Sequence, residues 1–365
     1  MRILFAGGNG WLPEASGGTQ NSTDHLIRES RAQGHECAVY CGFSGRGLFG
    51  FRMKVQRKIT GRPFSIDHSQ GYEVMRTWEP HDPARIKAAV DHFRPDIVVV
   101  QTRRSASLGQ QFARLGLPVL LYLRNVEFEE NDGDVSAIPG AHFIANSDFT
   151  AKAYRDAYGI TCTVITPTID FEKYRTETTR EFATLINIHP KKGYEIARDM
   201  AHACPEIPFL FVEAWTLWDE LFKQIMAEID ALPNVTFMRR TSDMSQVYGR
   251  TKVLLAPSQW EEAWGRVASE AHCSGIPVIG SDRGGLPQAI GPGGKVLAHE
   301  APIEDWVATL RTLWSDEAAY TELSNAALDY AKRPELCFAP QHRAFLTALE
   351  ACILGHQTTR LSNTG

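Results

Sequence analysis

The stretch KVLLAPSQWEEAWGRVASEAHCSG, residues 252–275, contains a complete strand–loop–helix unit. KVLLA is a short apolar run typical of a buried strand, and the alanine-rich segment from about Gly265 onward has the composition of a helix. The loop between them carries two tryptophans and two acidic residues. A strand followed by a loop and a helix is typical of a parallel sheet. In such folds the loops after the strands carry the function.

The same alternation continues through the whole chain. Uninterrupted apolar runs are separated by helix-length amphipathic segments, which is the pattern of a parallel sheet covered on both faces. In the first half the expected strands are RILFA (2–6), ECAVYC (36–41), YEVMRT (72–77), DIVVVQ (96–101), PVLLYLR (118–124), HFIAN (142–146) and CTVIT (162–166). In the second half they are ATLIN (183–187), PFLFVE (208–213), VTFMR (235–239), KVLLA (252–256), PVIG (277–280) and KVL (295–297). We therefore expect an α/β fold with two doubly wound, Rossmann-like parallel-sheet domains.

A length of 365 residues suits two domains of ordinary size. Segment 169–182 is mostly polar and charged, so we predict an interdomain linker there, between an N-terminal domain at 1–168 and a second domain at 183–335. A last helix, about 338–355, follows the break KRPE and is expected to cross back onto the first domain. Two such sheets would face a central cleft, where folds of this kind bind ligands.

Composition excludes several classes of protein. The apolar share of 43% is that of a soluble globular protein, and the net charge of −5 argues against nucleic-acid binding. The seven cysteines include no Cys-x-x-Cys, and the twelve histidines form no cluster at ligand spacing, so neither disulfides nor a metal site are expected. RILFA directly after Met1 does not resemble a signal peptide, and no run is long enough to span a membrane. We expect a cytoplasmic protein, at most peripheral to the inner face of the membrane.

The 257–265 loop has the features of an anion site. If the helix begins near Gly265, the unpaired N–H groups of residues 264–267 form such a site, and the glycine allows close approach. Glu262 just before it suits a hydroxyl-rich group, and Glu270 lies about 8 Å further along the helix at ~1.5 Å per residue. An acid, an anion site and a second acid match a sugar, a diphosphate and a ribose. The alternative is that the acids complement the helix dipole and that Glu270 bonds to a neighbouring loop.

Glu262-x₇-Glu270 and the GRVASEAHCSGIPVIGSDRGGLPQAIG that overlaps it resemble the donor-site signature of retaining glycosyltransferase family 4. GGTQNSTDHLIRESRAQGHECAVY (17–40) is similar to the family's N-terminal Gly-Gly loop and helix, and FIANSDFTAKAYRDAYGITCTVITPTID (143–170) to its interdomain approach. The resemblance implies a GT-B fold whose first domain binds the acceptor and whose second binds the donor. It also implies metal-independent, retaining transfer from a UDP-, GDP- or ADP-sugar to a glycan, a lipid-linked sugar or a small molecule, with no cofactor besides the donor.

The same resemblance assigns roles to individual residues. Glu262 would hold hydroxyls of the donor sugar, Glu270 would hold the ribose, and Lys192 in NIHPKKGYEIA (187–197) would lie against the diphosphate. Backbone groups that approach the donor are expected at Gly17, Gly18, Ala263, Trp264, Gly265, Arg266, Val267, Gly284 and Gly285.

One departure from the family pattern lies five residues before Lys192. The family usually has an arginine there, whereas this chain has Asn187, which removes one positive charge from the diphosphate site. Lys191, Arg239 or Arg240 could compensate, and we include Arg239 and Asn187 among the candidate donor-binding residues.

A second departure follows the fifth strand of the first domain. The family often has a histidine there, and PVLLYLRN places Arg124 instead. An arginine can donate to a sugar hydroxyl or to an acceptor phosphate but cannot act as a general base. The implied chemistry tolerates this, because the leaving diphosphate accepts the acceptor's proton while the enzyme positions the substrates and stabilises charge. The alternative is a structural ion pair at Arg124.

Segment 45–62, GRGLFGFRMKVQRKITGR, stands out in an acidic protein. It holds six basic residues, no acid, and apolar residues such as Leu48 and Phe51 between them. One interpretation is docking to an anionic membrane leaflet or to a phosphate-bearing lipid acceptor. The other is a solvated loop that lines the acceptor cleft.

Three other functions are alternatives to glycosyl transfer. A nucleotide-sugar epimerase needs carboxylate and histidine acid–base groups around the sugar, and a phosphorylase usually needs a lysine that carries pyridoxal; neither constellation is visible. The third alternative, a non-catalytic nucleotide-sugar binder, remains open because of Asn187 and the missing histidine.

Overall fold

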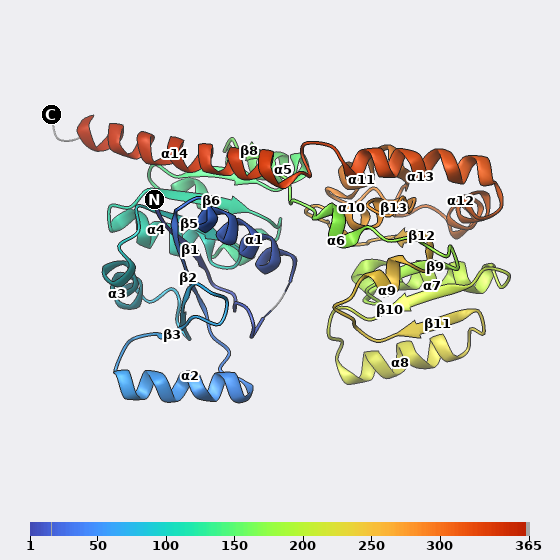
Figure 1. The fold of residues 1–365 in the computed structure, drawn as a ribbon, viewed down its shortest axis with the longest axis horizontal. Helices are drawn as coiled ribbons and strands as arrows, with labels where there is room; N and C mark the ends of the chain where they lie inside the picture. The colour runs from blue at the N-terminus through green and yellow to red at the C-terminus, as the bar shows by residue number, and fades with distance from the viewer. Residues whose placement is uncertain (16, 363–365) are drawn as a thin grey trace. The chain divides into compact units, whose positions relative to one another are not determined.

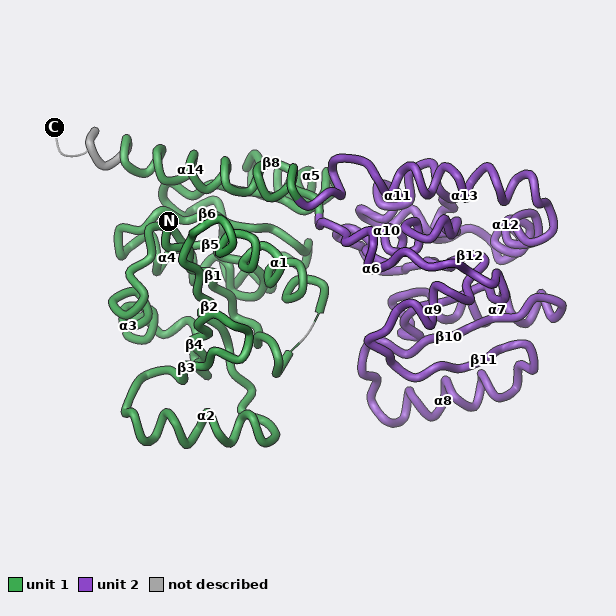
Figure 2. Tube along the Cα trace, viewed as in Figure 1, with its two compact units in different colours: residues 1–166, 339–365 green, residues 167–338 purple. Residues whose placement is uncertain are grey.

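The computed structural model describes residues 1–15 and 17–362, and their side chains up to residue 358. The chain forms two compact units (Figures 1 and 2). Unit 1 comprises residues 1–166 and the chain from 339 onward, and unit 2 comprises residues 167–338.

Unit 1 contains an eight-stranded sheet in the order β3-β4-β2-β1-β5-β6-β7-β8, parallel except for β3, which is antiparallel to β4. Its strands are β1 (Arg2–Gly7), β2 (Glu36–Gly42), β3 (Ser65–Asp67), β4 (Glu73–Thr77), β5 (Ile97–Gln101), β6 (Val119–Leu123), β7 (His142–Ala145) and β8 (Thr163–Val164). Its helices are α1 (Gly18–Ala32), α2 (Gly47–Thr60), α3 (Pro83–Phe93), α4 (Ser105–Arg114), α5 (Asp148–Tyr158) and α14 (Phe338–Ser362), with short 3-10 turns at Phe128–Asn131 and Val135–Ala137.

Unit 2 contains a six-stranded, fully parallel sheet in the order β11-β10-β9-β12-β13-β14. Its strands are β9 (Phe182–Ile186), β10 (Phe209–Val212), β11 (Val235–Met238), β12 (Thr251–Ala256), β13 (Val278–Ser281) and β14 (Gly294–Leu297). Its helices are α6 (Phe171–Tyr174), α7 (Tyr194–Ala203), α8 (Asp219–Asp230), α9 (Ser245–Tyr248), α10 (Arg266–His272), α11 (Leu286–Ile290), α12 (Ile303–Ser315) and α13 (Glu317–Ala331), with 3-10 turns at Pro190–Lys192 and Gly291–Gly293.

The central strands are buried on both faces. All five residues of β5, for example, are buried, and helices cover both sides of the sheet (Figure 1). Burial on both faces explains why these strands read as continuous apolar runs rather than as alternating patterns. The prediction of two doubly wound parallel sheets is confirmed.

Each sheet has one point at which its strand order reverses. β1 pairs with both β2 and β5, and β9 pairs with both β10 and β12. The chain leaves the first strand toward one edge of the sheet and later returns to its other side. The loops that follow the two strands at this reversal diverge, which leaves room for a ligand at the carboxyl ends.

Segment 169–182 is not the linker that its polar sequence predicted, because it packs onto unit 2. Ile169 is buried in the core beside β12, and the hydroxyl of Ser274 donates to the carbonyl of Tyr174 and accepts from the amide of Thr176. The polar side chain of Thr178 donates to the backbone of Thr251. Most charged side chains of the segment are exposed, which explains its polar composition, while the hydrogen bonds to Ser274 and Thr251 attach it to unit 2.

The last helix, α14, packs on unit 1. The rings of Phe345 and Phe5 stack with centroids 6.1 Å apart, His342 and Ser30 share a hydrogen bond of 3.0 Å, and the Cys352 thiol lies 3.4 Å from the carbonyl of Val119. Within the described part of the chain, no helix combines the length and the apolar character needed to cross a bilayer.

Candidate active site

Lys192 and Glu262 meet where the strand order of unit 2 reverses. Lys192 lies in the loop after β9 and Glu262 in the loop after β12. The Lys192 ammonium forms an ion pair with Oε1 of Glu262, and the Ser258 hydroxyl donates to the same oxygen at 2.9 Å. Only 18% of the lysine side chain and 16% of the glutamate side chain are exposed. The structure thus brings together the residue predicted to lie against the diphosphate and the residue predicted to hold hydroxyls of the donor sugar.

Backbone contacts hold these two loops together. The carbonyl of Lys191 accepts the N–H groups of Gln259 and Trp260, both at 3.0 Å. Gly193 adopts a φ of +79°, and a Cβ at this position would lie 1.9 Å from the carbonyl oxygen of Pro257. Because only glycine avoids this clash and tolerates the left-handed conformation, Gly193 permits the close approach of the two loops.

The loop of Glu262 also packs against the turn before α11. Gly284 has a φ of +62°, and a Cβ there would lie 2.2 Å from the Glu262 carbonyl oxygen, which accepts the N–H of Gly285 at 2.5 Å. The sequence assigned the backbone of Gly284 and Gly285 to the donor. The structure corrects this for the Gly285 amide, because its N–H already bonds to Glu262. These glycines position the glutamate.

Glu270 is a buried carboxylate on α10 with two partners. It accepts a hydrogen bond from the Tyr248 hydroxyl at 3.0 Å and pairs with Arg266, one helical turn earlier, at 3.2 Å. Burial, and then the charge of Glu270, raise the pKa of Tyr248 well above its usual range, so the tyrosine remains a donor. Glu270 therefore has structural partners, although they lie on α9 and α10 rather than on the neighbouring loop of the alternative interpretation. A carboxylate accepts about four hydrogen bonds, so it retains capacity for ribose hydroxyls.

The start of α10 differs in part from the sequence prediction. The helix begins at Arg266 after Gly265, whose φ is +100°, and it has only seven residues, so few peptide dipoles align. The Trp264 side chain is buried, and its indole N–H donates to Ser269 at 3.1 Å. In the described part of the chain, no hydrogen-bond acceptor contacts the amides of residues 264–267. Any anion bound here would depend on these amides and on Lys192 more than on a helix dipole.

Asn187 has a conformational role that the sequence did not reveal. Its φ is +82°, its side chain is buried, and its Oδ1 accepts the N–H of Trp215 at 3.3 Å. Asparagine is among the few non-glycine residues that tolerate this left-handed region. Asn187 therefore fixes the exit of the chain from β9 and the loop after β10.

Two of the three basic residues proposed to compensate for the missing arginine have other contacts. Arg239 pairs with Glu213 at 3.3 Å and lies over the rings of Phe222 and Phe237. Lys191 places its ammonium 3.6 Å from the centroid of the Trp260 ring. Neither of these contacts involves the Lys192–Glu262 pair.

Sequence reasoning missed several groups around this pair. The Trp215 ring lies 4.6 Å from the Lys192 ammonium, a distance at which cation–π attraction fixes the lysine. Burial, and then the charges of Lys191 and Lys192, lower the pKa of His189, so its neutral ring accepts the Lys191 amide at 3.0 Å. The available signal for Trp215 was its position two residues after an expected strand.

In unit 1, Arg124 lies buried at the end of β6. Its guanidinium donates to the Ser22 hydroxyl at 2.6 Å and stacks 3.7 Å above the Tyr122 ring. Gly17 caps α1 with extended backbone, and a Cβ there would meet only the tip of the Gln20 side chain, at 3.0 Å. Packing within unit 1 therefore does not require glycine at 17, in contrast to Gly193 and Gly284.

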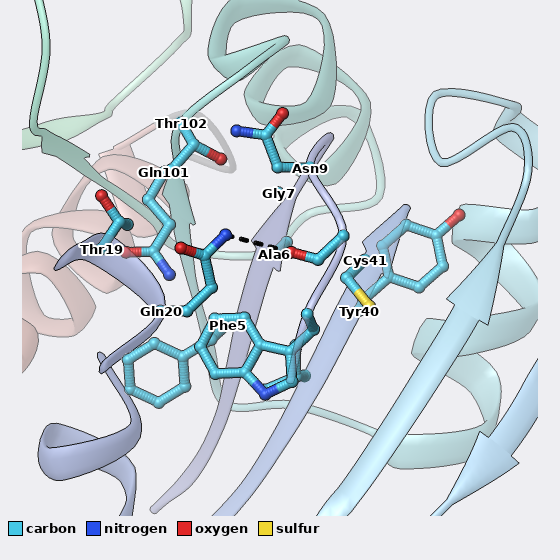
Figure 3. A pocket seen from close by; sticks show the side chains of 13 residues that line it. Phe5, Ala6, Gly7, Asn9, Thr19, Gln20, Tyr40, Cys41, Gln101 and Thr102 are labelled. Atoms are coloured by element: carbon cyan, nitrogen blue, oxygen red, sulfur yellow. Dashed lines mark hydrogen bonds between the residues drawn. The ribbon is translucent and has the colours of Figure 1, made fainter. Parts of the chain in front are cut away.

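Figure 3 shows a pocket at the strand reversal of unit 1. The end of β1, the start of α1 and residues Gln101 and Thr102 line it, and the Gln20 amide donates to the Gly10 carbonyl at 3.2 Å. The space for the centre of a water molecule is about 10 Å³, which is room for one water at most. In this conformation the pocket does not hold a sugar.

The chain has two doubly wound sheets, and each has polar loops where its strand order reverses. These features place it in the class of two-unit α/β proteins, in which ligands bind at the carboxyl ends of the strands. Two family models match the chain: "Glycosyltransferase Family 4" over residues 16–173 and "Glycosyl transferases group 1" over residues 168–332. The chain belongs to this family of glycosyltransferases and has the GT-B fold.

Relatives of known structure share the fold at low identity. HepE of Anabaena, solved with UDP and glucose, has a TM-score of 0.77 and 18% identity over 96% of this chain and 100% of its own. A glycosyltransferase of Rickettsia africae has a TM-score of 0.74 and 14% identity over 96% and 98% of the two chains.

Among sequence relatives, the D-inositol 3-phosphate glycosyltransferase of Corynebacterium aurimucosum is 32% identical over 96 residues, which are 26% of this chain and 23% of that protein. The enzyme of the same name from Mycolicibacterium vanbaalenii is 36% identical over 111 residues, 29% of this chain and 24% of that protein. The chain thus spans about a quarter of the length of these relatives.

Proposed function

We propose that this protein transfers a sugar from a nucleotide diphosphate sugar to an acceptor hydroxyl with retention of the anomeric configuration. The observation that carries the proposal is the Lys192–Glu262 ion pair at the strand reversal of unit 2. Membership of the glycosyltransferase family supports it and argues against the epimerase alternative.

The pair is suited to an exchange of partners when the donor binds. Without a ligand, each charge neutralises the other at a site where both side chains are mostly buried. A diphosphate carries more negative charge than one carboxylate, so it would displace Glu262 as the partner of Lys192. Glu262, still held by the Ser258 hydroxyl, would then accept hydrogen bonds from hydroxyls of the donor sugar.

The same arrangement supplies transition-state stabilisation. As the bond between the sugar and the diphosphate breaks, negative charge develops on the leaving phosphate oxygen. A positioned ammonium lowers the energy of that state more than that of the bound donor, and this difference is what accelerates the reaction. In the proposed reaction the departing diphosphate accepts the proton of the acceptor hydroxyl, so no side-chain base, metal or further cofactor takes part.

Other predicted residues complete the proposal. Glu270, oriented by Tyr248 and Arg266, would bind the ribose hydroxyls. The backbone of residues 263–267 would contact the diphosphate. Arg124 would donate to an acceptor oxygen, with its guanidinium oriented by the Ser22 hydroxyl and the Tyr122 ring.

Donor identity is the first quantity to measure. UDP-sugars lead the screen because HepE was solved with UDP-glucose, followed by GDP- and ADP-sugars. D-inositol 3-phosphate belongs in the acceptor panel because relatives bear its name. A true donor at a hundredfold its dissociation constant should stabilise the folded protein by about 2.7 kcal/mol in a thermal-shift assay.

Turnover is then measured as nucleotide release with and without acceptor, and the anomeric configuration of the product is read by proton NMR. The proposal expects acceptor-dependent release and a retained configuration. Tight donor binding without release in any acceptor pool would favour the non-catalytic binder, and an inverted product would exclude the retaining mechanism.

A further inference from the structure

Helix α2, Gly47–Thr60, carries an apolar stripe on its outer surface. Leu48, Phe51, Val55 and Ile59 are 90%, 66%, 40% and 79% exposed. Their spacing places all four within about 80° of one another around the helix, at 3.6 residues per turn. Exposed single apolar residues are ordinary, but four aligned on one helix of fourteen residues form a continuous surface.

The opposite face fixes the orientation of this stripe. Gly50 and Met53 are buried, and the Gln56 side-chain amide bonds to both the amide and the carbonyl of Ile66 in β3, at 3.0 and 2.7 Å. The guanidinium of Arg57 lies 4.2 Å from the Trp78 ring centroid. The helix lies beyond the β3 edge of the sheet in unit 1 (Figure 1). Because its inner face is anchored, rotation of α2 cannot hide the apolar stripe.

Basic residues border the apolar stripe. At 100° per residue, Arg52 lies on one side of it and Lys54 and Lys58 on the other. All three are exposed, as are Arg46 and Arg62 near the helix ends. Across residues 1–15 and 17–358, whose side chains are described, no carboxylate forms an ion pair with any of them. Segment 45–62 contains no acid, although the chain carries a net charge of −5. Residues 47–60 thus form a helix and not the solvated loop that one interpretation expected. Its basic border is not neutralised by carboxylates.

We propose that α2 docks on the surface of a lipid bilayer that contains anionic lipids. The apolar stripe would enter the boundary between headgroups and acyl chains while the basic border contacts lipid phosphates, as interfacial amphipathic helices do. With fourteen residues α2 is about 21 Å long, so it lies in the interface rather than crossing the membrane. A protein partner would have to match an apolar stripe and positive charge on both flanks, whereas an anionic bilayer offers both along its whole surface.

The test is co-sedimentation of the full chain with vesicles of phosphatidylcholine alone or with about 30 mol% phosphatidylserine, at near-physiological salt. We expect binding to the anionic vesicles and at least roughly tenfold weaker binding to the neutral ones. No binding of the wild-type chain to anionic vesicles overturns the proposal.

Two triple variants separate the two contributions. The apolar triple is Leu48→Ser, Phe51→Ser and Ile59→Ser, and the basic triple is Arg52→Glu, Lys54→Glu and Lys58→Glu. Because all six side chains are exposed, folding should persist, which circular dichroism checks. Each triple is expected to weaken binding to anionic vesicles by at least roughly tenfold. For the basic triple the reason is that each basic residue contributes about fivefold. For the apolar triple the reason is that interfacial binding scales with the apolar area that enters the bilayer.

A matched control replaces three exposed basic residues elsewhere in unit 1: Lys87→Glu, Arg114→Glu and Lys152→Glu. This control changes the net charge as much as the basic triple does, and it should retain wild-type vesicle binding. Equal losses in the control and the basic triple would show a net-charge effect and overturn the proposal. Self-association that the apolar triple abolishes, without vesicle binding by the wild type, would identify the apolar stripe as a contact between copies of the chain instead.

Discussion

The ammonium of Lys192 and the carboxylate of Glu262 form an ion pair that joins the loops after β9 and β12. The two residues are seventy positions apart in the sequence. The Ser258 hydroxyl and the Trp215 ring hold the pair from two sides, and Gly193 and Gly284 allow the backbones around it to approach. Its geometry therefore depends on four further loop positions.

Removing either charge should abolish most glycosyl transfer. We expect Lys192→Met and Glu262→Gln each to lower kcat/KM at least about a hundredfold, the usual cost of losing one group that stabilises developing charge. Stability should fall by only about 1–2 kcal/mol, because the remaining charge is partly exposed. Steady-state kinetics and urea denaturation measure the two effects.

Lys191→Met is the matched control for Lys192→Met. Lys191 is the neighbouring residue and its ammonium stacks on Trp260 instead of pairing with Glu262. We expect this variant to keep its kcat/KM within about threefold of wild type, the effect of a contact worth about half a kcal/mol. If Lys191→Met lost as much activity as Lys192→Met, the specific role of Lys192 would be rejected.

Gly193→Ala should disrupt the site through its backbone. The new Cβ would meet the Pro257 carbonyl at 1.9 Å, and alanine is strained at a φ of +79°. We expect a loss of more than about 2 kcal/mol in unfolding free energy together with loss of donor binding. Gly116→Ala, at a φ of +76° with no atom within 4 Å of the new Cβ, should cost only about 1 kcal/mol. Similar losses in chemical denaturation would show that strain alone, rather than contact between the loops, requires Gly193.

Asn187 should be replaceable by glycine more easily than by alanine. Its φ of +82° favours glycine, so Asn187→Gly should lose mainly the hydrogen bond to the Trp215 amide, about 1 kcal/mol. Asn187→Ala loses the same bond and adds about 1 kcal/mol of backbone strain. Thermal unfolding compares the two, and an alanine variant at least as stable as the glycine variant would contradict the conformational role.

His272 should make the fold sensitive to acid. Burial, and then the charge of Arg333, lower the pKa of His272 to about 3 from an ordinary value of 6.5. The unfolded chain therefore binds the proton first, so this contribution to stability is complete above about pH 6.5 and is lost as the pH falls toward 3. At about pH 5 the loss should reach roughly 2 kcal/mol.

His272→Gln should remove this dependence. At about pH 8 the difference in unfolding free energy between this variant and wild type measures the cost of replacing the buried ring. At about pH 5 that difference should be smaller by about 2 kcal/mol, because only the wild type loses stability when histidine takes up a proton. Urea denaturation at the two pH values provides the comparison. A difference that stays constant with pH would mean that another group accounts for the acid sensitivity.

The sequence by itself determined the two sheets, most of their strands and the identity of the central pair. Buried parallel strands require continuous apolar runs and the helices between them require amphipathic periods, so local pattern carries this information. Lys192 and Glu262 were identifiable because their loops follow such runs and resemble the donor-site pattern of the family. The same local reasoning failed at 169–182, because a segment with mostly exposed charged side chains does not reveal that its backbone bonds to Ser274 of unit 2.

Only the tertiary structure decided how these residues act on one another. That Gly285 bonds to the Glu262 carbonyl, that Asn187 turns the chain in a left-handed conformation, and that α2 exposes an aligned apolar stripe all depend on segments distant in sequence. The physical reason is that hydrogen-bond partners and steric clashes depend on which atoms lie nearby in the folded chain. Local patterns record whether a residue is buried, and they do not record which neighbour covers it.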